Sequence, residues 1–176
     1  MKKSIAIDMD EVLADTLKKV IFQFNERTGM DIKKEDLYEK KLRTEYPEHL
    51  DKLDNLLLDR AFFRDLEVLP DAIRVVERLN QHFDVYIATA AMDVPTSFDA
   101  KYEWLREHFP FLDPQHFIFC GNKGIVGTDY LIDDNPRQLA AFKGTGLIFD
   151  AVHNQSIKEF DRMNSWLDVE KYFFED

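Results

Sequence analysis

The chain has 176 residues, of which 45% are hydrophobic and 32% are charged, and its formal net charge is −11. This length suffices for one domain with a sizeable core, or for one core domain carrying a small insertion. The acidic excess argues against a nucleic-acid partner or a membrane surface, because both present negative charge. It leaves room for a small anionic substrate, because local cations and a metal ion can overcome the overall field at one site.

Cys120 is the only cysteine, so no disulfide can form within the chain, and a reducing compartment suits it. Its apolar neighbours predict that Cys120 is a buried strand residue. No stretch of the sequence approaches the roughly 20 apolar residues of a membrane helix. We therefore expect a cytoplasmic protein.

The first half of the chain begins with a short apolar run at residues 4–9, which predicts a buried strand. Apolar residues at helical spacing predict a helix over 17–24 that ends near Gly29. Residues 31–60 are rich in charge and predict helix in short pieces. A further helix is expected after Pro70, with three apolar residues facing inward: Ile73, Val76 and Leu79.

The second half alternates short apolar runs with helical patterns. Four more strands are predicted at 85–88, 117–120, 130–132 and 147–149, and helices are predicted at 100–108, 138–142 and 157–173. This alternation predicts an α/β fold, a Rossmann-like parallel sheet with helices on both faces.

Residues 17–69 lie between the first two strands and carry no strand signal. We interpret them as a small helical cap inserted after the first strand, so that the core domain comprises 1–16 and 70–176. Open parallel sheets bind ligands beyond the carboxyl ends of their strands. The residues that end the strands are therefore the candidates for function.

Acids, a hydroxyl and an amine follow four of the predicted strands: Asp8 and Asp10, then Thr89, then Lys123, then Asp133 and Asp134. This set suits phosphoryl transfer, which needs an in-line nucleophile and neutralisation of charge on the phosphoryl oxygens. Asp8 is the candidate nucleophile and metal ligand, and Asp10 is placed to pass protons. Thr89 and Lys123 are suited to hold a phosphate, and a hard cation such as Mg²⁺ suits the carboxylates.

An acid after a buried strand is often only a turn or helix cap. Paired acids after two different buried strands are harder to explain in this way, because like charges repel and require a cation. The combination therefore favours a functional site over caps alone.

These residues resemble the motifs of the haloacid-dehalogenase superfamily of phosphatases. The sequence D-M-D-E-V at 8–12 is similar to its first motif, Thr89 to its second, Lys123 to its third, and Asp133 with Asp134 to its acidic fourth. A closer resemblance is to the 5'(3')-deoxyribonucleotidases. It is carried by the segments D-M-D-E-V-L-A-D (8–15), F-F-R-D-L-E-V-L-P (62–70), K-Y-E-W (101–104), L-I-D-D (131–134) and H-N-Q (153–155).

The resemblance implies a role for each acid. Asp8 would be the nucleophile and a metal ligand, and Asp10 would be the general acid and base and would bind the metal through its carbonyl oxygen. Asp134 would bind Mg²⁺ directly, with Asp133 in the outer shell.

The resemblance also implies a substrate site and an activity. The substrate-binding set is Thr89, Ala90, Lys101 and Lys123, where Ala90 replaces the serine that is frequent in the family. The expected activity is magnesium-dependent hydrolysis of a nucleoside monophosphate through an aspartyl-phosphate intermediate. Nucleic acid and membrane partners are not expected, and the oligomeric state stays open.

Two departures bear on the substrate. Mammalian members stack the base on aromatic residues of the cap, at positions occupied here by Thr16 and Leu57. These departures leave the nucleoside specificity open, so a phosphatase for a non-nucleotide metabolite is an alternative. A phosphomutase and a non-catalytic metabolite-binding module on the same fold are further alternatives. A dehalogenase does not need the second acid of the first motif, so Asp10 argues against that activity.

The histidines, His153 among them, are expected to be surface or packing residues, and Phe62 and Phe63 are expected to pack in the core.

Overall fold

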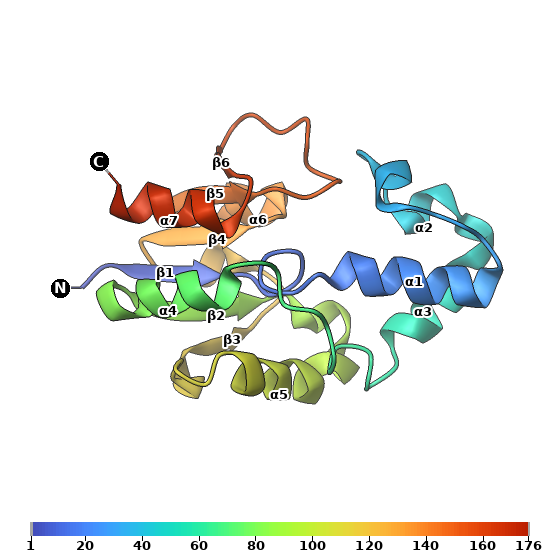
Figure 1. Ribbon diagram of the computed structural model, residues 1–176, viewed down its shortest axis with the longest axis horizontal. Coiled ribbons are helices and arrows are strands. Elements are labelled where there is room, and N and C mark those ends of the chain that lie inside the picture. Colours follow the sequence, from blue (N-terminus) through green and yellow to red (C-terminus); the bar gives the residue numbers. More distant parts are fainter. Residues whose placement is uncertain (1, 176) are drawn as a thin grey trace.

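The computed structural model describes residues 2–175 and contains a six-stranded sheet in which every pairing is parallel (Figure 1). The strand order is β3-β2-β1-β4-β5-β6. The strands are β1 (Ser4–Ile7), β2 (Asp84–Thr89), β3 (Phe117–Phe119), β4 (Tyr130–Asp133), β5 (Thr145–Phe149) and β6 (Asp161–Met163). The predicted α/β class and parallel sheet are confirmed.

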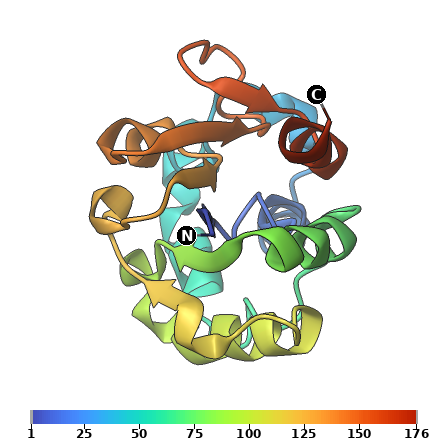
Figure 2. The same cartoon turned by 90° about the vertical axis from the view of Figure 1, so that its left-hand side faces the viewer.

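Helices cover both faces of the sheet because the side chains of each strand alternate between two hydrophobic clusters. In β1, Ile5 and Ile7 belong to one cluster and Ala6 to the other. On the first face lie α4 (Ala72–His82) and α7 (Trp166–Phe174), and on the second lies α6 (Pro136–Ala141), as Figure 2 shows.

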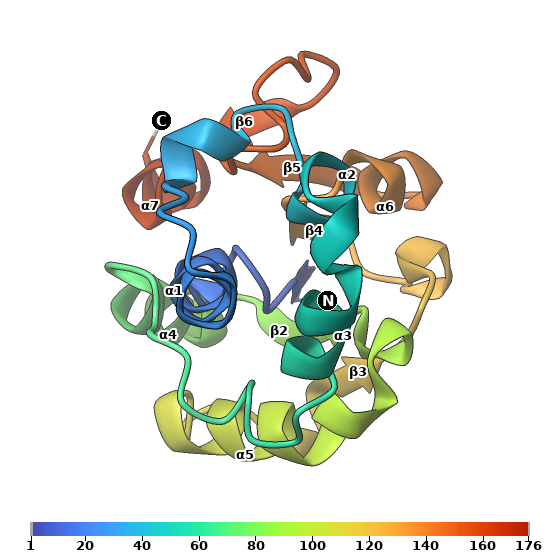
Figure 3. The same cartoon turned by 90° about the vertical axis from the view of Figure 1, so that its right-hand side faces the viewer.

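The chain between β1 and α4 forms a helical segment beyond the carboxyl end of the sheet (Figures 1 and 3). It contains α1 (Thr16–Thr28), α2 (Leu42–Glu45), α3 (Leu50–Leu57) and two 3-10 turns at Lys34–Leu37 and Pro47–His49. The prediction of short helical pieces is confirmed. Gly29 ends α1 with φ +75°, a left-handed conformation that costs glycine little. None of the helices within residues 2–175 has the length and hydrophobicity needed to cross a bilayer.

Two details of the prediction are wrong. The residues 157–173 do not form one helix, because β6 pairs with β5 and a new helix, α7, begins after Ser165, whose side chain accepts from the Asp168 amide. In α4, Ile73 is 40% exposed, whereas the buried residues are Ala72, Val75, Val76 and Leu79. That set has the i, i+3, i+4, i+7 spacing of one helix face, and Ile73 lies off it.

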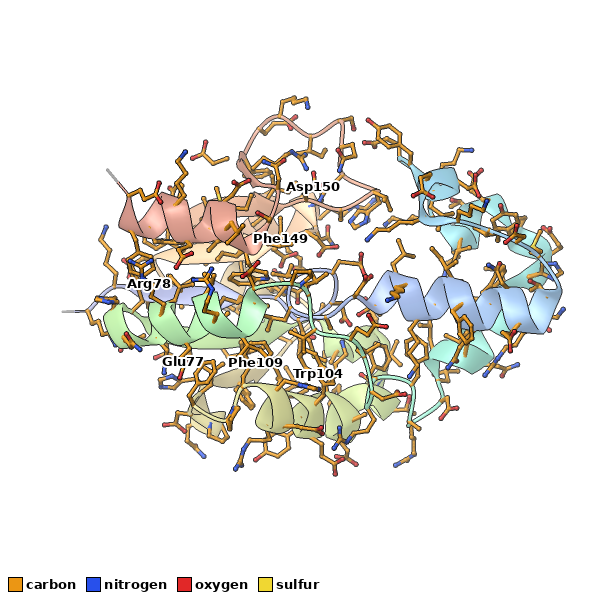
Figure 4. The ribbon with its side chains drawn as sticks, viewed as in Figure 1. Glu77, Arg78, Trp104, Phe109, Phe149 and Asp150 are labelled. Atoms are coloured by element: carbon orange, nitrogen blue, oxygen red, sulfur yellow. The ribbon has the colours of Figure 1, made fainter. Side chains whose placement is uncertain are left out.

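Two buried tryptophans tie distant segments to the core. Trp104 lies in α5 (Phe98–His108), and its Nε1 donates to the carbonyl of Leu66 at 2.9 Å. Its ring lies 5.7 Å from that of Phe109, and both side chains lie between α4 and α5 in Figure 4. Trp166 of α7 donates from Nε1 to the carbonyl of Val12 at 2.8 Å, which anchors the loop after β1.

We predict that Trp166→Phe destabilises the fold by about 1–3 kcal/mol, because the buried Val12 carbonyl loses its donor while most of the ring packing stays. Equilibrium urea unfolding measures the change. Leu167→Ala is the matched control on the same helix, where the side chain is 52% exposed, and it should change stability by less than about 0.5 kcal/mol. Equal losses in the two variants would contradict the anchoring role of Trp166.

Candidate active site

The candidate site lies where the sheet order reverses, since β1 pairs with β2 on one side and with β4 on the other. Ligands of open parallel sheets bind at such a point. Asp8 follows β1 directly, Thr89 ends β2, and Asp133 ends β4. Lys123 begins a short 3-10 turn after β3. The sheet therefore brings the strand-terminating residues together, as the sequence predicted.

The ammonium group of Lys123 is buried between two carboxylates. Its Nζ lies 2.6 Å from Asp8 Oδ1 and 2.5 Å from Asp133 Oδ2. Burial alone would lower the pKa of Lys123, but the charges of Asp8 and Asp133 outweigh that effect and raise it. Lys123 therefore stays charged inside the protein.

Asp8, Asp133 and Asp134 form a buried carboxylate cluster, and one oxygen from each lies within 4.8 Å of the others. Burial is the largest cause that raises the pKa of Asp8, to about 7, although Lys123 opposes it. The pKa of Asp134 is raised well above its usual value by burial and by repulsion from Asp8 and Asp133. The single positive charge of Lys123 does not balance the negative charge of the three carboxylates.

The cluster fits a small hard cation such as Mg²⁺. Its donors are carboxylate oxygens, the ligands such ions prefer. Asp8 Oδ1 is buried, and the close partner that the structure gives it is Lys123 Nζ at 2.6 Å, an ammonium that Asp133 shares. Three buried carboxylates around one ammonium leave negative charge that a further cation would balance.

Asp10 lies beside the cluster in a second polar network. Thr16 Oγ1 donates to Asp10 Oδ1 at 2.8 Å, and Lys101 Nζ pairs with Asp10 Oδ2. Lys101 Nζ also donates to Thr89 Oγ1 at 3.1 Å. Asp10, Thr89 and Lys101 are thus brought together, and Thr16 holds one Asp10 oxygen in place.

A loop after β5 supports the site, although neither the strand pattern nor the charge pattern of the sequence indicated this. Asn154 is fully buried there, and its Nδ2 donates to the carbonyl of Asp134 at 2.7 Å and to that of Phe149 at 2.8 Å. Arg162 donates to Asn154 Oδ1 at 2.9 Å. His153, expected to be a surface or packing residue, lies with Nε2 3.2 Å from Asp134 Oδ2. The segment 153–155 was one of those that carried the family resemblance, and it is the only sequence signal that pointed here.

A pocket of about 560 Å³ joins the cluster to the helical segment. Of the predicted site residues, those that line it are Asp8, Asp10, Ala90, Lys101, Lys123, Asp133 and Asp134. Thr89 is fully buried and is not among the lining residues, and its hydroxyl contacts the lining residue Lys101. Thr16 and Leu57 also line the pocket. Phe62 and Phe63 are buried as expected, and Phe63 lines the pocket.

Solved structures identify the fold as that of the haloacid-dehalogenase-like hydrolases. One example is YfnB of Bacillus subtilis, a protein described as a haloacid-dehalogenase-type hydrolase, whose structure was solved with bound magnesium. It superposes with a TM-score of 0.59 over 99% of each chain at 13% sequence identity. At that identity the likeness concerns the fold alone.

Sequence comparison then gives the family. Residues 2–174 match the family model described as 5' nucleotidase, deoxy (pyrimidine), cytosolic type C protein. A Staphylococcus aureus (strain Mu50) protein assigned as a 5'(3')-deoxyribonucleotidase is 60% identical, over 99% of this chain and 97% of its own. The 5'(3')-deoxyribonucleotidase of Bacillus subtilis (strain 168) is 37% identical over 97% and 98%. The chain belongs to this deoxyribonucleotidase family.

We predict that Asp134→Asn stabilises the metal-free protein by about 1–2 kcal/mol near pH 8, because it removes one charge from the cluster. The raised pKa values mean that the folded state binds protons more tightly than the unfolded chain. The stability they contribute is present below about pH 4 and is lost as the pH rises to 7 and beyond. The gain from Asp134→Asn should therefore shrink near pH 5.

Urea unfolding in the presence of a chelator measures this gain. Asp161→Asn, which removes one charge from an exposed side chain on β6, is the matched control and should give no pH-dependent gain. Destabilisation by Asp134→Asn at both pH values would contradict the electrostatic strain in the cluster.

Proposed function

We propose that this protein hydrolyses deoxynucleoside monophosphates with the help of a divalent metal ion and with Asp8 as the covalent nucleophile. The observation that carries this proposal is the buried Lys123 ammonium within 2.6 Å of Asp8 Oδ1, beside a carboxylate cluster at the floor of a pocket. Family membership supports the choice of substrate class, because the similar proteins carry the deoxyribonucleotidase name.

In the first step of the proposed mechanism, a carboxylate oxygen of Asp8 attacks the phosphorus atom. The bond between phosphorus and the ester oxygen breaks, and Asp10 donates a proton to the departing nucleoside oxygen. The product of this step is an aspartyl phosphate on Asp8.

In the second step, water attacks the phosphorus of the aspartyl phosphate while Asp10 accepts a proton from it. The bond between phosphorus and the Asp8 oxygen breaks, which releases inorganic phosphate and restores the carboxylate. The contacts of Asp10 with Thr16 and Lys101 support this role, because they orient its carboxylate before either proton transfer.

Magnesium would be held by the side chains of Asp8 and Asp134 and by the carbonyl oxygen of Asp10, with Asp133 in the outer shell. When bound, the ion supplies positive charge against the phosphoryl oxygens. Lys123 adds a second positive charge beside Asp8. The fit of a hard cation to the carboxylate cluster supports this arrangement.

The phosphoryl group would be bound by Thr89, Ala90, Lys101 and Lys123. Residues 17–69 would act as a cap over a core domain formed by 1–16 and 70–176, since Leu17, Leu57 and other residues of that segment line the pocket. We further propose that the protein works in the cytoplasm, a location that suits its single buried cysteine.

A second candidate function is hydrolysis of a small phosphorylated metabolite that is not a nucleotide. It is favoured by the shortage of aromatic surface in the pocket. Thr16 and Leu57 line the wall, and the phenyl ring of Phe63 is only 4% exposed and has Lys101 Nζ 4.7 Å from its centroid. A base would therefore find apolar walls but no free aromatic platform.

We predict hydrolysis of deoxynucleoside 5'- and 3'-monophosphates in the presence of Mg²⁺, with little discrimination among bases. The Asp8→Asn variant should hydrolyse none of them.

The Leu57→Trp variant should lower KM for nucleotides more than for an aryl phosphate, because stacking of a base on the new ring contributes roughly 1–3 kcal/mol. Phosphate release across a substrate panel, with and without a chelator, measures these rates.

Leu58→Trp is the matched control, because Leu58 is 50% exposed and is not among the residues that line the pocket. It should leave KM for nucleotides unchanged. If sugar phosphates are cleaved well and every nucleotide only at background rate, the nucleotidase proposal is wrong and the second candidate replaces it.

A further inference from the structure

Two cationic side chains line the outer part of the pocket without an acidic partner. Lys41 lies directly before α2, in the helical segment, and Arg137 lies in the first turn of α6, in the core. Neither side chain makes an ion pair or a hydrogen bond in the part of the chain that the structure describes, residues 2–175. The two residues come from different parts of the fold, since α2 belongs to the helical segment beyond the sheet and α6 to a helix layer on the sheet (Figure 1).

The other cations that line the pocket already have acidic partners. Lys101 pairs with Asp10, and Lys123 pairs with Asp8 and Asp133. Lys40 lies 3.2 Å from Glu45, and Arg43 pairs with Asp54. Lys41 and Arg137 are therefore the two lining cations whose charge is left for a ligand.

Two cations without an acidic partner are unexpected on a chain with this net negative charge. The chain has 34 acidic and 23 basic side chains, so an acid is easily found for a surface cation. Beyond the carboxylates of the floor, Asp93 is the one acid among the lining residues. Because Lys40 and Arg43 are paired with Glu45 and Asp54, the charges left for an anion in the outer pocket are those of Lys41 and Arg137.

The transferred phosphate does not account for these charges, because the proposed function places it on the floor beside Lys123. An additional anion on the leaving group would. The same pocket offers a base little aromatic surface at Thr16 and Leu57. The leaving group would then be held by ion pairs with Lys41 and Arg137 and not by stacking on an aromatic ring.

We propose that Lys41 and Arg137 form a subsite for a second phosphate group, so that the preferred substrates are phosphate monoesters whose leaving group carries another phosphate, such as a deoxynucleoside 3',5'-bisphosphate. Guanidinium binds phosphate through paired hydrogen bonds, and ammonium adds a point charge. The pocket volume of about 560 Å³ lies within the usual range for small ligands. This proposal rests on the proposed function, because it takes the scissile phosphate to lie at Asp8 and Lys123.

The test compares kcat/KM for a deoxynucleoside 3',5'-bisphosphate with that for the 5'-monophosphate, and for a sugar bisphosphate with that for the sugar monophosphate. We expect at least about a tenfold preference for the doubly phosphorylated member of one pair, carried by KM. Added salt should weaken the preference, because the subsite is open to solvent.

Lys41→Ala and Arg137→Ala should each lower the ratio of bisphosphate to monophosphate kcat/KM by roughly three- to tenfold. Lys33→Ala is the matched control: it makes the same change in net charge on the helical segment, outside the residues that line the pocket, and should keep the ratio. Calorimetric binding of each pair to Asp8→Asn gives the same comparison without turnover.

The outcomes separate this proposal from the proposed function. A preference for the sugar bisphosphate with no nucleotide cleaved supports the subsite and contradicts the nucleotidase. Cleavage of monophosphates and bisphosphates with equal kcat/KM, equal affinity of both for Asp8→Asn, or a ratio unchanged by Lys41→Ala and Arg137→Ala overturns the subsite while the nucleotidase stands.

Discussion

The buried ammonium of Lys123 between Asp8 and Asp133 is the contact on which the rest of the site depends. Asp8 and Asp133 end neighbouring strands, and their carboxylates could not lie this close inside the protein without a cation between them. Because Lys123 stands on the turn after β3, two strands away from β1, the three groups are brought together by the assembled sheet.

The cluster still carries more negative charge than one lysine balances. The pKa of Asp8 rises to about 7, and that of Asp134 rises well above its usual value. Such strain lowers the stability of the metal-free fold, and a fold that served only its own stability would have no reason to keep it. The remaining negative charge and the adjoining pocket together fit the binding of a cation and a phosphate.

The sequence predicted most of the fold because five strands are short apolar runs separated by helical patterns. It predicted the floor of the site because the acids and the lysine directly follow those runs. It missed β6, whose residues Asp161–Met163 include one apolar side chain and lie at the sheet edge, where a polar strand is tolerated. It also missed Asn154 and His153, because their contacts with Asp134 arise from the folding of a loop and leave no periodic pattern.

Asp8, held beside Lys123, is the proposed nucleophile that attacks phosphorus. The most direct measurement is mass spectrometry of peptides after acid quench of the protein with Mg²⁺ and a cleavable phosphate monoester. If Asp8 is the nucleophile, the peptide that contains Asp8 carries a phosphoryl group, which disappears on treatment with hydroxylamine and is absent from Asp8→Asn. Steady turnover by a protein whose Asp8 peptide never carries phosphate, even when quenched within the first turnover, would contradict this role of Asp8.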